Sequence, residues 1–170
     1  MKKIFVAASI LAIAAAVGAT AIHASAKAGD EAEIKALEQR LIDGIKAKDI
    51  KQMMSCYVPG DQLFVFDIVP PRQYAGSAAY QKSWQNFLDL FKGPIDAELS
   101  DLVITSDGRL AFSHSIQHLA GTTKDGKPFD SNLRVTDGYR KIHGKWLIVL
   151  EHISVPIDMA TGKPDFSSKP

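Results

Sequence analysis

The chain has 170 residues and balances 20 lysines and arginines against 19 acidic residues, for a formal net charge of +1. A near-neutral chain of this length predicts one domain and argues against nucleic-acid binding, which needs a basic surface. Cys56 is the only cysteine, so an intramolecular disulfide is excluded, and its neighbours Met53 and Tyr57 predict a buried, inert thiol.

Residues 1–26 have the pattern of a secretory signal peptide. Lys2 and Lys3 precede an apolar run from Ile4 to about Ala21, and Ala24-Ser25-Ala26 forms a small-residue cleavage site. An uncleaved membrane anchor is the alternative, because the apolar run is nearly long enough to span a bilayer. We predict that the segment is removed, which gives a periplasmic or secreted protein with no membrane attachment after cleavage.

Three helices are predicted in the first half of the chain. Asp30 to Lys48 has apolar residues at helical spacing with charged residues between them. A short second helix begins after the cap Asp49 and ends before Pro59-Gly60. A third begins at the cap Ser77, carries an aromatic face and ends at Gly93-Pro94.

Five strands are predicted, one between the second and third helices and four after them. They are Leu63 to Val69, Ile95 to Thr105, Leu110 to Ala120, Ser131 to Ile142 and Lys145 to Val155. The last two are joined by a tight turn at His143-Gly144. This order predicts an α+β domain over residues 27–156, with three N-terminal helices packed on a mostly antiparallel sheet, and an irregular tail over 157–170.

Alternation along the strands predicts which side chains face a hollow between sheet and helices. In Leu110 to Ala120, the face with His114 and His118 is the bulkier and more apolar, so we expect it inside. Three of the other strands, the first and the last two, each carry an acid on an apolar face. The ionisable residues on these faces are Asp67, His114, His118, Asp137 and Glu151. If the faces converge, the residues form an acid–base constellation in a low-dielectric pocket.

Structural roles for the same residues stay open. A histidine on an apolar strand face is more often a core residue than a ligand contact. Asp67 could cap the turn before Pro70, and Asp137 and Glu151 could form buried ion pairs. His114 and His118 are about 13 Å apart along a strand and would not share a metal ion. We predict no metal and no cofactor.

The final hairpin, Arg134 to Pro156, together with Phe66-Asp67 ahead of Gly76, resembles the NTF2-like superfamily. The branch is that of the SnoaL-like, ketosteroid-isomerase-like proteins, and the association domain of calcium/calmodulin-dependent kinase II is also similar. The resemblance spans roughly Glu31 to Pro156. It implies a cone-shaped, cystatin-like α+β fold, a deep cavity between sheet and helices, and a homodimer formed through the outer sheet face.

The resemblance also implies roles for individual residues. Asp67 matches a general base, and Asp137 matches an acid that donates a hydrogen bond to an oxyanion. Leu41 stands near the place of the family's oxyanion tyrosine, so we do not expect steroid isomerisation. The residues predicted to be catalytic are Asp67, His114 and Asp137. Those predicted to bind ligand are Tyr74, Trp84, His118, Tyr139 and Glu151, and the resemblance gives Glu151 no role.

Three functions remain in view. The preferred one is binding of a small organic molecule in a polar-lined pocket without turnover. The second is an acid–base isomerase, cyclase or dehydratase, with Asp67 as base, His114 or His118 as its partner and Asp137 as donor. The third is a protein-interaction module that uses an outer sheet face. The residues expected on that face are Arg134, Thr136, Arg140, Trp146 and His152.

Overall fold

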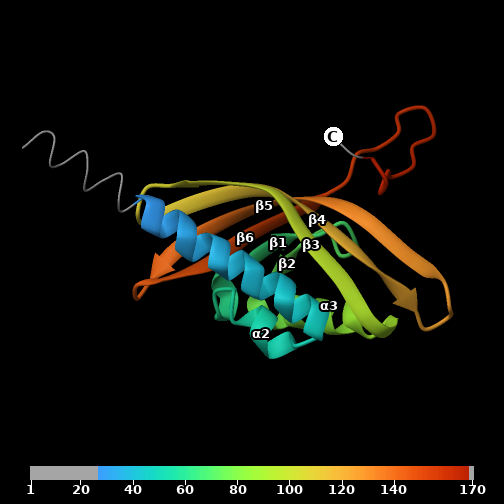
Figure 1. The fold of residues 1–170 in the computed structure, drawn as a ribbon, viewed down its shortest axis with the longest axis horizontal. Helices are drawn as coiled ribbons and strands as arrows, with labels where there is room; N and C mark the ends of the chain where they lie inside the picture. The colour runs from blue at the N-terminus through green and yellow to red at the C-terminus, as the bar shows by residue number, and fades with distance from the viewer. Residues whose placement is uncertain (1–26, 169–170) are drawn as a thin grey trace, which may run out of the picture.

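The structure is a computed structural model that describes residues 27–168. The predicted signal peptide, residues 1–26, lies outside the described residues. Figure 1 shows the helices on one side of a curved sheet, with the first helix lying along its concave face. The predicted α+β plan, with three helices packed on a mostly antiparallel sheet, is therefore confirmed.

The elements follow the predicted order with changed bounds. They are a first helix over residues 27–47, α2 (Ile50–Met54), a 3-10 turn (Gly60–Gln62), β1 (Phe64–Phe66), β2 (Tyr74–Ala75), α3 (Ser77–Leu88), β3 (Phe91–Ser106), β4 (Leu110–Thr123), β5 (Pro128–Ile142) and β6 (Lys145–Ser154). No helix within residues 27–168 is both long and apolar enough to cross a membrane.

The first helix packs on the sheet through its apolar stripe. The members of this stripe are Ile34, Leu37, Leu41, Ile42 and Ile45, and all are at most 2% exposed. The helix ends at Lys48, whose φ of 52° lies in the left-handed region. Asp49 then caps α2 as predicted, because its carboxylate accepts the Gln52 backbone N–H at 2.9 Å.

The third helix differs from the prediction at both ends. Its N-cap is Gly76, and the Ser77 hydroxyl instead accepts the Gly60 backbone N–H at 2.9 Å. The helix ends at Leu88, so Phe91 begins β3 and pairs with Thr123 of β4. Strand pairing thus extends through Gly93-Pro94, where the register shifts.

The sheet has the order β2-β1-β6-β5-β4-β3, and only β1 and β6 pair in parallel. The last strand, β6, lies between β1 and β5 rather than at an edge, as a strand that is apolar on both faces predicts. The β5–β6 turn has φ values of 49° at His143 and 77° at Gly144, which suits a two-residue hairpin. β1 is shorter than predicted, and β2 was not predicted at all.

The chain after β6 has little regular structure. Ile157 and Pro164 form an isolated bridge, and the Phe166 carbonyl accepts the Asn132 backbone N–H at 2.8 Å. The Phe166 ring is partly buried against the core. This segment is therefore tied to the end of β5 that β6 does not reach.

Candidate functional site

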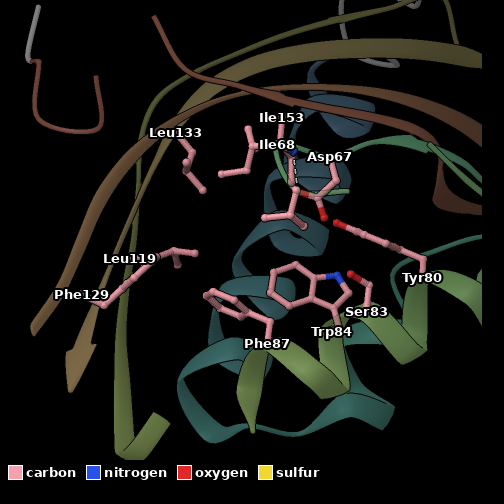
Figure 2. A pocket seen from close by; sticks show the side chains of 11 residues that line it. Asp67, Ile68, Tyr80, Ser83, Trp84, Phe87, Leu119, Phe129, Leu133 and Ile153 are labelled. Atoms are coloured by element: carbon pink, nitrogen blue, oxygen red, sulfur yellow. Dashed lines mark hydrogen bonds between the residues drawn. The ribbon is translucent and has the colours of Figure 1, made fainter. Parts of the chain in front are cut away.

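A pocket opens between α3 and the sheet (Figure 2). Its empty space is about 490 Å³, with the open mouth included. It is lined by Asp67, Ile68, Val69, Tyr80, Ser83, Trp84, Phe87, Leu119, Phe129, Leu133 and Ile153. The lining is mainly aliphatic and aromatic, so the prediction of a polar-lined pocket is wrong for this hollow.

One face of α3 supplies the aromatic wall. Tyr80, Trp84 and Phe87 follow one another at spacings of four and three residues, so their rings lie on the same side of the helix. Their centroids are 5.9 Å apart for Tyr80–Trp84 and 5.8 Å apart for Trp84–Phe87, both edge-to-face. Phe87 also contacts Phe129 of β5 edge-to-face. The wall is therefore a continuous row of packed rings.

Asp67 is the only carboxylic acid among the described residues that line the pocket. Its carboxylate accepts the Ile68 backbone N–H at 2.7 Å, which fixes its direction. Figure 2 shows its carboxyl and the Tyr80 hydroxyl pointing toward one another. Burial raises the pKa of Asp67, opposed by hydrogen bonds from the backbone of Ile68 and Val69. A carboxyl of this kind is suited to proton transfer.

Three further carboxyls lie deeper in the domain, and we call Glu38, Asp137 and Glu151 the interior acid cluster. Each is at most 2% exposed. They come from the first helix, β5 and β6, and Asp137 lies directly opposite Glu151 in the β5–β6 register. The topology thus gathers three acids that the sequence separates widely.

Tyrosine hydroxyls satisfy part of this cluster. Glu151 accepts from Tyr57 at 2.8 Å and from Tyr80. Glu38 accepts from Tyr139 at 2.7 Å, and the Tyr139 hydroxyl is 2.6 Å from that of Ser113. Neither oxygen of Asp137 has a hydrogen-bond partner among residues 27–168.

Burial dominates the acid–base properties of the cluster. It raises the pKa of Glu38 to about 7, opposed by the Tyr139 hydrogen bond. It also raises the pKa of Glu151 to about 7, opposed by the bonds from Tyr80 and Tyr57. The pKa of Asp137 is also raised well above its ordinary value, by burial and then by the charges of Glu38 and Glu151. These acids favour the protonated state inside the fold.

The residues predicted for the site fall in several places: some line the pocket, some lie in the interior, and others belong to neither region. Asp67 and Trp84 line the pocket. Tyr74 lies behind the wall, where its hydroxyl accepts from Ser83 at 3.0 Å. Asp137, Tyr139 and Glu151 are buried in the interior and do not line the pocket.

His114 and His118 do not face the pocket, and that prediction is wrong. On β4 the buried positions are Ala111, Ser113, Ser115, Gln117 and Leu119. His114 lies on the opposite, outer face, and His118 pairs there with Asp130 at 3.1 Å. The smaller face is inside because the first helix packs closely here, bringing Glu38 to Tyr139, whose hydroxyl also contacts Ser113. The prediction that the bulkier face of this strand is buried was therefore wrong.

Trp146 is also misplaced by the prediction. It is 4% exposed and faces inward, where its Nε1 donates to Asp30 at 3.3 Å. The cause is a bulge in β6, because Ile148 and Leu150 pair with consecutive residues of β5 and Val149 is the extra residue. The bulge reverses the alternation, so Leu147 and Val149 do not share the face of Glu151. The other residues expected outside, Arg134, Thr136, Arg140 and His152, are exposed.

Glu38, Tyr57 and Tyr80 were not predicted as members of the site. Glu38 could have been found, since it lies four residues from both Ile34 and Ile42 and so belongs to the apolar stripe of the first helix. The tyrosines carry no such signal, because an aromatic residue on an apolar face is ordinary core. Cys56 is buried and burial raises its thiol pKa, as expected of an inert cysteine.

The described residues hold no group of three His, Cys, Asp or Glu side chains placed to bind a metal ion. The arrangement can bind an uncharged molecule with a large apolar surface, orient it on the aromatic wall and present one carboxyl and one phenol to it. Asp67 and Tyr80 can thus supply proton transfer and hydrogen bonding to a molecule in the pocket.

Comparison with known proteins identifies the architecture. A family model described as a SnoaL-like domain matches residues 34–158. An NTF2-like protein of unknown function from Pseudomonas putida KT2440 is 31% identical, with a TM-score of 0.75, over 84% of this chain and 98% of that one. No curated protein matches this chain.

Two more distant solved structures share the fold. One, from Xanthomonas campestris, is provisionally named a calcium/calmodulin-dependent protein kinase II association domain; it is 22% identical, with a TM-score of 0.62, over 72% of this chain and 84% of that one. The other, from Novosphingobium aromaticivorans, is provisionally named a scytalone dehydratase; it is 15% identical, with a TM-score of 0.65, over 75% of this chain and 85% of that one.

Proposed function

This chain belongs to the SnoaL-like domain family, and we propose that it binds a small, largely apolar organic molecule in the pocket and transfers a proton to or from it through Asp67. One observation carries the proposal: a single carboxyl, directed at a phenol, lies in a mainly apolar pocket. Binding is supported by the aromatic wall, and the raised pKa of Asp67 supports acid–base chemistry.

The ligand is expected to be uncharged. Among the described residues that line the pocket, none is a lysine, arginine or histidine that could pair with an anion. An anion would also be repelled by Asp67 when that carboxyl is ionised. A flat ring system with one oxygen function would cover the wall and place the oxygen near Asp67 and Tyr80.

The corresponding reaction class is isomerisation or elimination, in which a base removes a proton beside an activating carbonyl. The name of the Novosphingobium neighbour makes loss of water the first reaction to test. His114 and His118 have no part in this proposal because they lie on the other face of the sheet. Tyr80 takes their place as the group beside Asp67.

Closing the pocket tests the binding proposal. Val69 is 48% exposed and lines the pocket, so Val69→Trp should fill it and abolish binding while the fold remains intact. Leu90→Trp is the matched control, since Leu90 is another half-exposed aliphatic residue and does not line the pocket. Binding of neutral bicyclic ketones and alcohols is measured by ligand-observed NMR. Equal binding by the Val69→Trp variant would contradict the proposal.

Catalysis is tested separately with Asp67→Asn. The amide keeps the size of the side chain but cannot take a proton, so turnover of any bound ketone or β-hydroxy ketone should fall at least about a hundredfold. Binding should change far less. Turnover at the wild-type rate would remove Asp67 as the proton-transferring group and leave a binding protein.

We also propose that the protein forms a homodimer through the outer sheet face and works in the periplasm or outside the cell. Val103, Leu110 and Phe112 are each more than half exposed on adjacent strands, and Leu150 extends the same patch across Gly138. Such a patch is typical of an interface. Phe112→Lys should give a monomer in analytical ultracentrifugation.

Export is tested separately. N-terminal sequencing of the exported protein should give a sequence that begins near Lys27, as expected after removal of the signal peptide.

A further inference from the structure

Glu151 is held between two phenols that come from different parts of the chain. Its Oε2 accepts from Tyr57 at 2.8 Å, and its Oε1 accepts from Tyr80. Tyr57 forms a bridge to Ile148 beside α2, whereas Tyr80 belongs to α3. The two rings meet edge-to-face with centroids 5.4 Å apart. The Glu151 carboxyl is thus fixed in place by two tyrosine hydroxyls, one on each oxygen.

The two phenols differ in what lies on their other side. Tyr80 lines the pocket, and its hydroxyl faces the Asp67 carboxyl in Figure 2. Both tyrosines are almost fully buried, Tyr80 at 1% and Tyr57 at 2% exposed, and Tyr57 does not line the pocket. Only Tyr80 therefore connects Glu151 with a bound molecule.

A phenol has one proton and so donates one hydrogen bond at a time. When Glu151 is ionised, it can only accept, and the Tyr80 proton is directed at it. The Tyr80 oxygen then offers only a lone pair to the pocket. When Glu151 is protonated, it can donate to Tyr80, and the Tyr80 proton is free to turn toward the pocket.

We propose that Glu151 is a positioning residue that sets whether the Tyr80 hydroxyl donates or accepts a hydrogen bond at the pocket wall. This inference rests on the proposed function, because it needs a ligand in the pocket. It specifies the ligand by chemistry: a carbonyl oxygen is favoured when Glu151 is protonated, and a hydroxyl donor when Glu151 is ionised.

The surroundings of Glu151 place this change near neutral pH. The groups that face it are Tyr57, Tyr80 on α3, Glu38 on the first helix, Asp67 after β1 and Asp137 on β5. Burial raises the pKa of Glu151 to about 7, the two tyrosine bonds oppose the rise, and the charges of Glu38 and Asp67 add to it. Among these five neighbours there is no cation to hold Glu151 ionised.

The test compares two probes of the same size, 1-tetralone, which has a carbonyl acceptor, and tetralin, which has none. Affinities are measured by NMR titration from pH 5.5 to 9. We expect 1-tetralone to bind about fivefold more weakly at the alkaline end, the worth of one hydrogen bond, while tetralin binds equally throughout.

Matched variants assign the effect to its source. Tyr80→Phe should remove the pH dependence, and Glu151→Gln, which cannot ionise, should remove it too. Tyr57→Phe also breaks one bond to Glu151, but should keep the dependence with its midpoint at higher pH. Asp67→Asn should also keep the dependence, because Asp67 is not its source, but with its midpoint at lower pH, because the Asp67 charge contributes to the raised pKa of Glu151.

Each outcome decides a separate point. Failure of both probes to bind the wild type overturns the proposed function. Binding of 1-tetralone that is independent of pH overturns the inference about Glu151 alone. The inference is also overturned if the dependence survives in either Tyr80→Phe or Glu151→Gln, or if it disappears in Asp67→Asn.

Discussion

The interior acid cluster and the pocket lie on either side of Tyr80 and differ in both polarity and access. Glu38, Asp137 and Glu151 are almost fully buried and surrounded by hydroxyls and like charges. The pocket has one acid, Asp67, on a wall of aliphatic and aromatic side chains. The acids whose pKa values are raised most are thus not the acid that lines the pocket.

This difference shows that a strongly perturbed pKa marks burial before it marks function. Desolvation is the largest cause of the rise for every acid in the cluster and for Asp67. Only Asp67 combines a raised pKa with access to the pocket. Substitutions in the interior acid cluster should therefore change mainly the free energy of unfolding. Substitution of Asp67 should change mainly the binding and turnover of a ligand.

The largest expected effect is a loss of stability as the pH rises from mildly acidic to neutral. Glu38 and Glu151 have pKa values of about 7 in the folded protein, above the ordinary 4.5, so the folded state binds more protons between these values. The free energy of unfolding should then fall as pH rises from about 4.5 to 7, by on the order of 3 kcal/mol per carboxyl. Asp137 shifts in the same direction.

Urea unfolding at pH 5 and pH 8 measures this loss. Glu38→Gln serves as the comparison, because its amide oxygen still accepts from Tyr139 but cannot ionise. The variant should lose less stability between the two pH values than the wild type does. Equal unfolding free energies at both pH values in the wild type would show that folding does not raise the pKa values of Glu38 and Glu151.

The second effect is a gain in stability from removing the unpartnered acid. Asp137→Val replaces a carboxyl that has no hydrogen-bond partner within the described chain by an apolar side chain suited to a strand. We expect the free energy of unfolding at pH 8 to rise by about 1–3 kcal/mol. Chemical denaturation tests this, and a loss of stability of similar size would mean that Asp137 has a stabilising role.

The third effect is smaller and concerns the acid of the pocket. Asp67 is only half-buried, and its contact with the Ile68 N–H can be kept by an amide oxygen. Asp67→Asn should therefore change the free energy of unfolding by less than about 1 kcal/mol. A thermal melt beside that of Asp137→Val provides the comparison. Strong destabilisation by Asp67→Asn would show that Asp67 has a structural role instead of a role in the pocket.

The smallest effect is expected from the outer-face histidines. His118 forms a partly exposed pair with Asp130, and His114 lies on the same side of the sheet, away from the pocket. Substituting either by glutamine should alter stability by less than about 0.5 kcal/mol and leave probe affinity within about twofold. NMR titration of 1-tetralone checks this, and a large loss of affinity would contradict the assignment of the two faces.

Much of the fold was predictable because its signals are local. The apolar stripe of the first helix, the Asp49 cap and the His143-Gly144 turn each depend on residues close in sequence, and all are present. The final hairpin carried the family resemblance, which the SnoaL-like match over residues 34–158 confirms. Asp67 and Trp84, which were predicted as site residues, both line the pocket.

The sequence by itself determined the order of elements, the family and the identities of the acids. Tertiary structure alone decided which face of β4 is inside and where the bulge in β6 reverses the alternation. Alternation defines two faces but does not say which one a helix will cover, and close packing of the first helix selected the smaller one. The same packing brought Glu38, Asp137 and Glu151 together and placed two phenols on Glu151, because contacts between distant residues exist only once the sheet has curved around the helix.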